Sequence, residues 1–154
     1  MESTFKILFV CLGNYCRSPA AHAIMLYMIE KKGLKNKISV DSCGTQAYEA
    51  GELPDSRMRK VCKKRGFNCN HIARRITKED LKSSNLIVCM DNSNYRNVIN
   101  LGGEEKKVKK MIDFISNKRG QDCVPDPWYG NESDFELAVD LIIDGCQGIL
   151  NKYK

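Results

Sequence analysis

A cysteine and an arginine six positions apart, Cys11 and Arg17, are the residues of this chain that point most directly to chemistry. They belong to the segment Cys11-Leu12-Gly13-Asn14-Tyr15-Cys16-Arg17-Ser18. The thiolate form of cysteine is a nucleophile, and nearby cations or a helix amino terminus favour it over the inert thiol. The planar guanidinium of arginine can hold two oxygens of one phosphate group. The spacing therefore predicts nucleophilic attack on a bound oxyanion.

The backbone between these two residues suits a phosphate. The segment follows an apolar run at residues 5–10 and leads into Ser18-Pro19, which predicts an N-cap and a first-turn proline. A loop that enters a helix in this way points several N–H groups at one site. Gly13 and Asn14 tolerate the left-handed backbone that such a loop needs. The alternative is that the cysteine only ends a buried strand and the arginine lies on the surface, but the flanking elements favour the chemical interpretation.

The elements that must position this loop alternate between strand and helix. Apolar and β-branched runs predict strands at residues 5–10, 37–41, 86–90 and 108–115. Amphipathic spacing and capping residues predict helices at residues 18–32, 54–66, 92–100 and 133–150, with a short one from residue 77. This alternation predicts one α/β domain over residues 1–154, with a parallel sheet covered on both faces. In such sheets ligands bind at the carboxyl ends of the strands.

Composition indicates an ordinary globular protein. Of the 154 residues, 42% are hydrophobic and 29% are charged, and no run approaches the ~18 apolar residues of a spanning helix. Met1 to Lys6 lacks the pattern of a secretory signal, so we expect a cytoplasmic protein without membrane association.

The net charge of +6 includes basic patches at residues 57–65 and 106–110. They could attract nucleic acid or acidic partners. However, Met58, Val61 and Cys62 fall at helical spacing within the first patch, which predicts a solvated helix face instead. We therefore expect no nucleic-acid partner and only a weak attraction for anionic substrates.

Eight cysteines would suggest disulfides in a secreted domain, but several lie inside apolar runs, where they act as small hydrophobic residues. There is no CxxC pair. His22 and His71 are far apart in sequence, and neither has a cysteine at zinc spacing. The sequence therefore predicts no structural metal.

The stretch from Val10 to Pro19 resembles the signature of the low-molecular-weight protein tyrosine phosphatases, and the resemblance extends through nearly the whole chain. The further matching segments are Asp41-Ser42, Tyr48, Pro54-Asp55, His71-Ile72-Ala73-Arg74, Thr77-Lys78-Glu79-Asp80, Cys89-Met90-Asp91 and Asp126-Pro127-Trp128-Tyr129. The resemblance implies a Rossmann-like three-layer sandwich with a four-stranded parallel sheet. It also implies hydrolysis through a phosphocysteine intermediate, with no metal and no cofactor.

By the same resemblance, Cys11 is the nucleophile, Arg17 binds the phosphate and Ser18 donates a hydrogen bond to the thiolate. Asn14 holds the loop, with His71 and Asp91 as supporting partners. The phosphate-binding residues are Leu12, Gly13, Asn14, Tyr15, Cys16 and Arg17. The alternatives are that His71 is a half-buried histidine whose hydrogen bonds are satisfied and that Asn14 is an ordinary turn residue.

A phenolic leaving group has a pKa of about 10, so its departure calls for an acid. Asp126 is the predicted acid because it follows the fourth strand at the same sheet edge as the cysteine and precedes two aromatic residues. Asp122 and Asp91 are the weaker candidates. By itself Asp-Pro indicates a turn, and the resemblance favours the catalytic role.

The resemblance implies a pocket for a phenyl ester. Its walls are Leu12, Tyr15, Tyr48, Trp128 and Tyr129. Aromatic faces suit a planar ring. Two residues depart from the commonest family pattern, because Tyr15 replaces an aliphatic residue and Trp128 replaces a tyrosine. The expected partners are phosphotyrosine-containing proteins or small aryl phosphates, with acid phosphatase activity, and the expected state is a monomer.

Cys16 suggests redox protection. A loop that curls around one phosphate should bring Cys11 and Cys16 within the ~4.4–6.8 Å Cα separation of a disulfide, so Cys16 could trap a sulfenic acid on Cys11. The alternative is that Cys16 only packs.

Three other functions share parts of the pattern. An arsenate reductase would need two further cysteines close together, whereas Cys89 has no partner until Cys123. A phosphocarrier subunit of a sugar transport system would have no use for Arg17 and Asp126. A catalytically dead phosphotyrosine-binding module would not need nucleophile, arginine and acid together.

Overall fold

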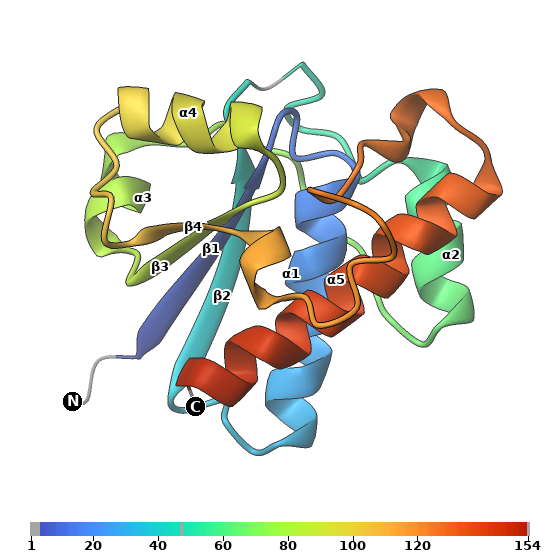
Figure 1. Ribbon diagram of the computed structural model, residues 1–154, viewed down its shortest axis with the longest axis horizontal. Helices are drawn as coiled ribbons and strands as arrows, with labels where there is room; N and C mark the ends of the chain where they lie inside the picture. Colours follow the sequence, from blue (N-terminus) through green and yellow to red (C-terminus); the bar gives the residue numbers. More distant parts are fainter. Residues whose placement is uncertain (1–3, 47, 154) are drawn as a thin grey trace.

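A four-stranded parallel sheet forms the centre of the computed structural model, which describes residues 4–46 and 48–153. The strands are β1 (Phe5–Cys11), β2 (Ile38–Gly44), β3 (Leu86–Cys89) and β4 (Val108–Lys110), in the order β2-β1-β3-β4. Every pair is parallel, so the carboxyl ends share the upper edge in Figure 1. Because β1 lies between β2 and β3, its carboxyl end is the switch point where such sheets bind ligands.

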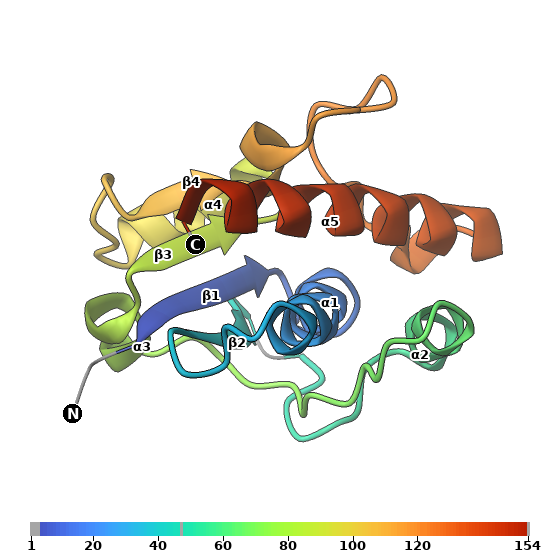
Figure 2. The same ribbon diagram turned by 90° about the horizontal axis from the view of Figure 1, so that it is seen from below.

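Helices cover both faces of this sheet, which confirms the predicted three-layer α/β sandwich. One face carries α1 (Arg17–Lys31), α2 (Ser56–Lys64) and α5 (Glu132–Tyr153), and the other carries α3 (Lys78–Ser83) and α4 (Asn92–Asn100) (Figures 1 and 2). Strand β1 shows why: Ile7 and Phe9 join the core under α1 and α5, while Leu8 and Val10 join the core under α3 and α4.

Most predicted helix boundaries agree with the structure, because the sequence carries their caps. The Asp55 carboxylate accepts from the backbone of α2, Thr77 forms a capping box with Asp80 in α3, and Asp91 caps α4. Gly33, with a φ of 66°, follows the end of α1. Within the described ranges, no helix is long and apolar enough to cross a membrane.

Several predicted boundaries are wrong. Strand β2 continues to Gly44, three residues past its predicted end, and α5 continues to Tyr153, three residues past its predicted end. Helix α1 begins at Arg17 with Cys16 as its N-cap residue, so Ser18 is already inside the first turn. Strand β4 ends at Lys110, and residues 111–114, predicted as strand, form a 3₁₀ turn. The reason is packing: Met111 is fully buried against Gly145 of α5, where even a Cβ would come within 2.8 Å of the Met111 Sδ.

Candidate active site

The loop between β1 and α1 is held in place by its neighbours. The Thr45 N–H donates to the Cys11 carbonyl at 3.0 Å, and the Gln46 N–H donates to the Leu12 carbonyl at 2.8 Å. Gly44 permits this approach, because a Cβ there would lie 2.7 Å from the Leu12 carbonyl oxygen. The end of β2 is therefore shaped to receive the loop, a role of Gly44 that sequence reasoning missed.

Within the loop, Asn14 takes the left-handed conformation with a φ of 53°, whereas Gly13 does not. Asparagine tolerates this conformation better than most residues. The Asn14 side chain is fully buried and accepts from the Arg74 N–H at 3.1 Å. Asn14 thus ties the loop to the segment that follows α2.

The Cys11 sulfur lies at the start of a buried chain of hydrogen bonds. Its Sγ is 3.0 Å from the Ser18 Oγ. The Asn14 Nδ2 donates to the Ser18 Oγ at 2.7 Å and to the Ser42 Oγ at 3.1 Å. Ser18 can reach the sulfur because it lies in the first turn of α1 and does not cap it. A hydroxyl held in this way can donate to a thiolate and orient it.

Arg17 is 3% exposed, and its partners hold its guanidinium in one position in the site. The Arg17 Nη1 donates to the Asp91 Oδ2 at 2.8 Å and to the Val124 carbonyl at 2.9 Å. Burial alone would lower the pKa of Arg17, but Cys11 and Asp91 outweigh burial and raise it. The side chain is therefore a permanent cation beside the sulfur.

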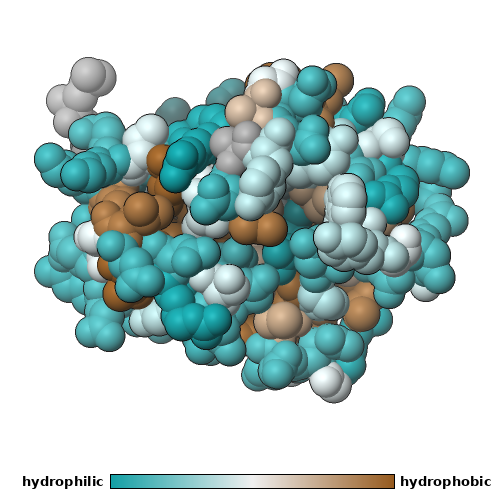
Figure 3. Space-filling model, turned by 90° about the horizontal axis from the view of Figure 1, so that it is seen from above, coloured by the Kyte–Doolittle hydropathy of each residue, from teal (hydrophilic) through white to brown (hydrophobic). Residues whose placement is uncertain are grey.

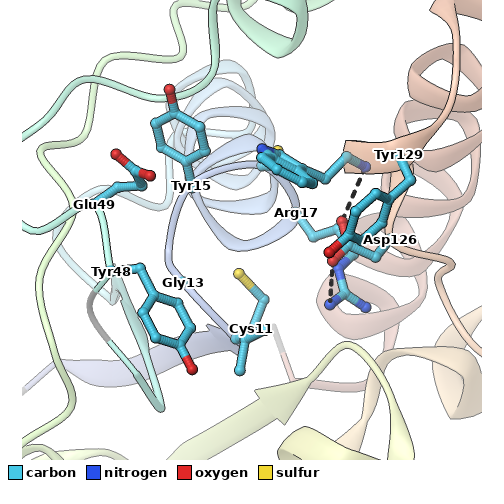
Figure 4. A pocket seen from close by; sticks show the side chains of 11 residues that line it. Cys11, Gly13, Tyr15, Arg17, Tyr48, Glu49, Asp126 and Tyr129 are labelled. Atoms are coloured by element: carbon cyan, nitrogen blue, oxygen red, sulfur yellow. Dashed lines mark hydrogen bonds and ion pairs between the residues drawn. The ribbon is translucent and has the colours of Figure 1, made fainter.

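Asp126 lies across the cavity from Cys11, in the loop that enters the 3₁₀ turn η2 (Pro127–Tyr129) (Figure 4). Its Oδ2 is 3.7 Å from the Arg17 Nη2, and its Oδ1 accepts from the Trp128 N–H at 3.1 Å. The other two acid candidates are placed less well. Asp91 is engaged by Arg17 and the amino terminus of α4, and Asp122 does not line the cavity.

These groups open into one cavity at the carboxyl edge of the sheet. It is lined by Cys11, Leu12, Gly13, Tyr15, Cys16, Arg17, Tyr48, Glu49, Asp126, Trp128 and Tyr129. The rim is open to solvent: Tyr48 is 75% exposed and Tyr129 is 89% exposed. Viewed from this edge, the surface is mainly hydrophilic with small separate hydrophobic patches (Figure 3).

The structure thus brings all five predicted pocket walls together. Glu49 is an addition that sequence reasoning missed, since nothing local distinguishes it from other exposed carboxylates. Burial, followed by the charges of Asp55 and Glu49, raises the pKa of Tyr15, so its hydroxyl stays protonated beside the site.

Behind the loop, the two histidines lie together despite their separation in sequence. The imidazole centroids of His22 and His71 are 4.7 Å apart. The His22 Nδ1 is 3.0 Å from the Ser42 Oγ, so His22 extends the hydrogen-bond chain that begins at Cys11. Burial, followed by the neighbouring His71, lowers the pKa of His22 to about 4. Burial also lowers the pKa of His71.

Comparison with known proteins agrees with this geometry. The family model for low molecular weight phosphotyrosine protein phosphatase matches residues 6–154. The low molecular weight phosphotyrosine protein phosphatase of Gallus gallus is 39% identical over 149 residues, which cover 96% of this chain and 94% of that protein.

Two solved structures are also similar. A protein tyrosine phosphatase from Entamoeba histolytica superposes with a TM-score of 0.92 at 42% identity, covering 97% of this chain and 96% of that one. A Drosophila arginine phosphatase gives 0.89 at 30% identity, covering 97% of this chain and 98% of that one. With a matching family model over nearly its full length and a relative 39% identical over 96% of it, this chain belongs to the low molecular weight phosphotyrosine protein phosphatase family.

Proposed function

We propose that Cys11, Arg17, Ser18 and Asp126 carry out the phosphotyrosine hydrolysis that characterises the family. The observation that carries the proposal is their convergence: a cysteine sulfur with a serine hydroxyl at 3.0 Å, a buried arginine and a carboxylate facing one cavity. Together they supply the nucleophile, hydroxyl donor, cation and acid that the proposed reaction needs.

In the first step, the Cys11 thiolate attacks phosphorus while the bond from phosphorus to the phenolic oxygen breaks. The loop N–H groups and Arg17 hold the non-bridging oxygens. Protonated Asp126 gives its proton to the leaving oxygen, which would otherwise depart as an anion of a group with pKa of about 10. The products are a phenol and a phosphocysteine, which the family forms without a metal.

In the second step, the Asp126 carboxylate takes a proton from a water molecule that attacks phosphorus. The sulfur–phosphorus bond breaks, phosphate leaves, and the thiolate is restored with help from the Ser18 hydroxyl. The 40% exposed side chain of Asp126 leaves room for this water.

The aromatic rim supports phosphotyrosine-containing proteins and small aryl phosphates as substrates, with acid phosphatase activity toward the latter. Tyr48, Trp128 and Tyr129 offer ring faces to a planar phenyl group. We further infer that the chain acts as one monomeric cytoplasmic domain, with neither nucleic acid nor membrane as a partner.

The decisive experiment is turnover of a phosphotyrosyl peptide and of p-nitrophenyl phosphate in the presence of a chelator. Cys11→Ser should abolish turnover yet still bind phosphate, whereas the control Cys123→Ser, outside the cavity, should retain it. A phosphoarginyl peptide in the same assay tests whether this chain also has the arginine phosphatase activity for which the Drosophila relative is named. Turnover by Cys11→Ser, or preference for phosphoarginine, would contradict the proposal.

We also propose that Cys16 protects Cys11 from irreversible oxidation. Both cysteines line the cavity. Burial, followed by the charges of Asp55 and Cys11, raises the pKa of Cys16, so peroxide should oxidise Cys11 first. The Cys16 thiol would then displace hydroxide from the sulfenic acid, giving a disulfide and water. After peroxide treatment, a thiol reductant should restore the phosphatase activity of the wild type but not that of Cys16→Ser. Equal recovery of activity would mean that Cys16 is only a packing residue.

A further inference from the structure

The described part of the chain contains one group of three potential metal ligands, and it lies behind the phosphate loop. His22 of α1, Asp41 of β2 and His71 of the segment after α2 each offer one ligand atom, and these atoms lie within 4.8 Å of one another. We propose that this His22-Asp41-His71 cluster is an inhibitory Zn²⁺ site. Two imidazole nitrogens and a carboxylate oxygen form a donor set that suits zinc, with a fourth position left for water.

An unpartnered atom supports this proposal. The Nε2 of His71 is buried and makes no hydrogen bond, and its distance to the Asp41 Oδ1 is 3.9 Å. The nitrogen therefore faces a carboxylate across a gap that is too wide for a hydrogen bond. Buried polar atoms in proteins nearly always have a partner, and a bound ion would supply one here.

The Asp41 carboxylate is oriented by other groups. Its Oδ1 accepts from the Ser42 N–H at 2.8 Å, and its Oδ2 accepts from the Arg74 Nη2 at 2.9 Å. Within the described ranges, Arg74 is the one arginine or lysine paired with Asp41, and it also pairs with Asp80 through two contacts of 2.8 Å. The two carboxylates and one guanidinium leave a net negative charge, which favours a divalent cation.

A hollow beside the histidines gives access to the site. It is lined by Pro19, His22, Ala23, Leu26, Asn68, Asn70 and His71. It is separate from the catalytic cavity, since the two share no lining residue. A cation and its water can therefore enter without passing Cys11.

The inhibitory effect follows from the hydrogen-bond chain and rests on the proposed function. Zinc bonds of about 2.0–2.1 Å put tetrahedral ligand atoms about 3.3 Å apart, so the cluster must contract from its present spacing when it binds zinc. Contraction pulls on His22, which contacts the Ser42 Oγ at 3.0 Å. Ser42 shares Asn14 with Ser18, and Ser18 contacts the Cys11 Sγ. Zinc bound at this site should therefore lower kcat without preventing substrate from binding.

The binding test needs no catalysis. In Cys11→Ser protein, which lacks the reactive thiolate, Zn²⁺ should shift the NMR imidazole signals of both histidines together, and these are the only two in the chain. His22→Gln should weaken Zn²⁺ binding at least about tenfold, the loss typical for even an indirect partner of a metal ligand. The control Asp113→Asn, an exposed carboxylate elsewhere, should bind as before.

The kinetic test uses the native enzyme. Zn²⁺ should reduce kcat at saturating substrate, and His22→Gln should lose this inhibition. The proposed site would be wrong if Zn²⁺ shifted the imidazole signals of neither histidine or of only one, or if it bound equally well to His22→Gln. Inhibition that saturating substrate relieves would indicate instead that the metal binds Cys11. An enzyme without turnover would contradict the proposed function while leaving the NMR result intact.

Discussion

The two sides of the phosphate loop are built in opposite ways. The rear, formed by Asn14, Ser18 and Ser42, is fully buried and bound by side-chain hydrogen bonds. The rim, formed by Tyr48, Trp128 and Tyr129, is 44–89% exposed. Buried polar networks hold groups in one position, whereas exposed aromatic residues can adapt to a ligand. The rear should therefore control kcat, and the rim should control which substrate is held.

After Cys11 itself, the largest effect should come from Asp126, the proposed acid, which lines the cavity beside the rim. Asp126→Ala should reduce kcat for phenyl phosphate by about 10²–10⁴-fold, because the leaving oxygen loses its acid. The loss should be much smaller for an ester whose leaving group is strongly acidic. Measuring kcat against leaving-group pKa tests this, and an equal loss across the series would make Asp126 structural.

Asn14 tests the rear directly. Asn14→Ala should lower kcat about 10–100-fold, since a small misplacement of the loop misaligns the attacking sulfur. Asn14→Gly permits the left-handed backbone but also lacks the side-chain hydrogen bonds, so its kcat should be reduced nearly as much. If Asn14→Gly restored wild-type kcat, the side-chain network would have no catalytic role.

Asp80, which pairs with Arg74 behind the rear, should make the stability of the fold depend on pH. Burial would raise the pKa of Asp80, but hydrogen bonds from Arg74 and Thr77 outweigh it and hold the pKa below its ordinary 3.8. Because the folded-state pKa is the lower one, this stabilisation is present above about pH 4 and is lost as pH falls through the folded-state value.

Asp80→Asn should therefore reduce the free energy of unfolding by about 1.5–3 kcal/mol at pH 7. Urea titrations from pH 6 to pH 3 should show a steeper decline for wild type than for the variant. Parallel curves would mean that other carboxylates govern the acid transition.

The smallest effect should come from the rim. Tyr48→Ala should raise KM for a phosphotyrosyl peptide about 2–10-fold with kcat nearly unchanged, because one aromatic contact is lost. Tyr48→Phe, which keeps the ring, is the matched control. A kcat loss comparable to that of Asn14→Ala would abolish the distinction between rim and rear.

Local chemistry explains what could be predicted from the sequence. The alternation of strands and helices, the caps at Asp55 and Thr77, and the loop from Cys11 to Arg17 each depend on residues close together in the chain. Helix α4 was predicted at its observed bounds, residues 92–100, since its cap and apolar spacing are both local. The resemblance then assigned roles to residues that spacing alone could not connect, such as Asp126.

Tertiary structure alone decided the rest. Only the packing of α1 beside β2 and the segment after α2 brings His22 to His71, 49 positions later in the sequence. The end of β4 depends on the packing of Met111 against Gly145 of α5. Glu49 lines the cavity only because of the course that its loop takes in the folded chain. Such contacts depend on distances between elements that no local pattern encodes, because the same residue types are also common on surfaces without partners.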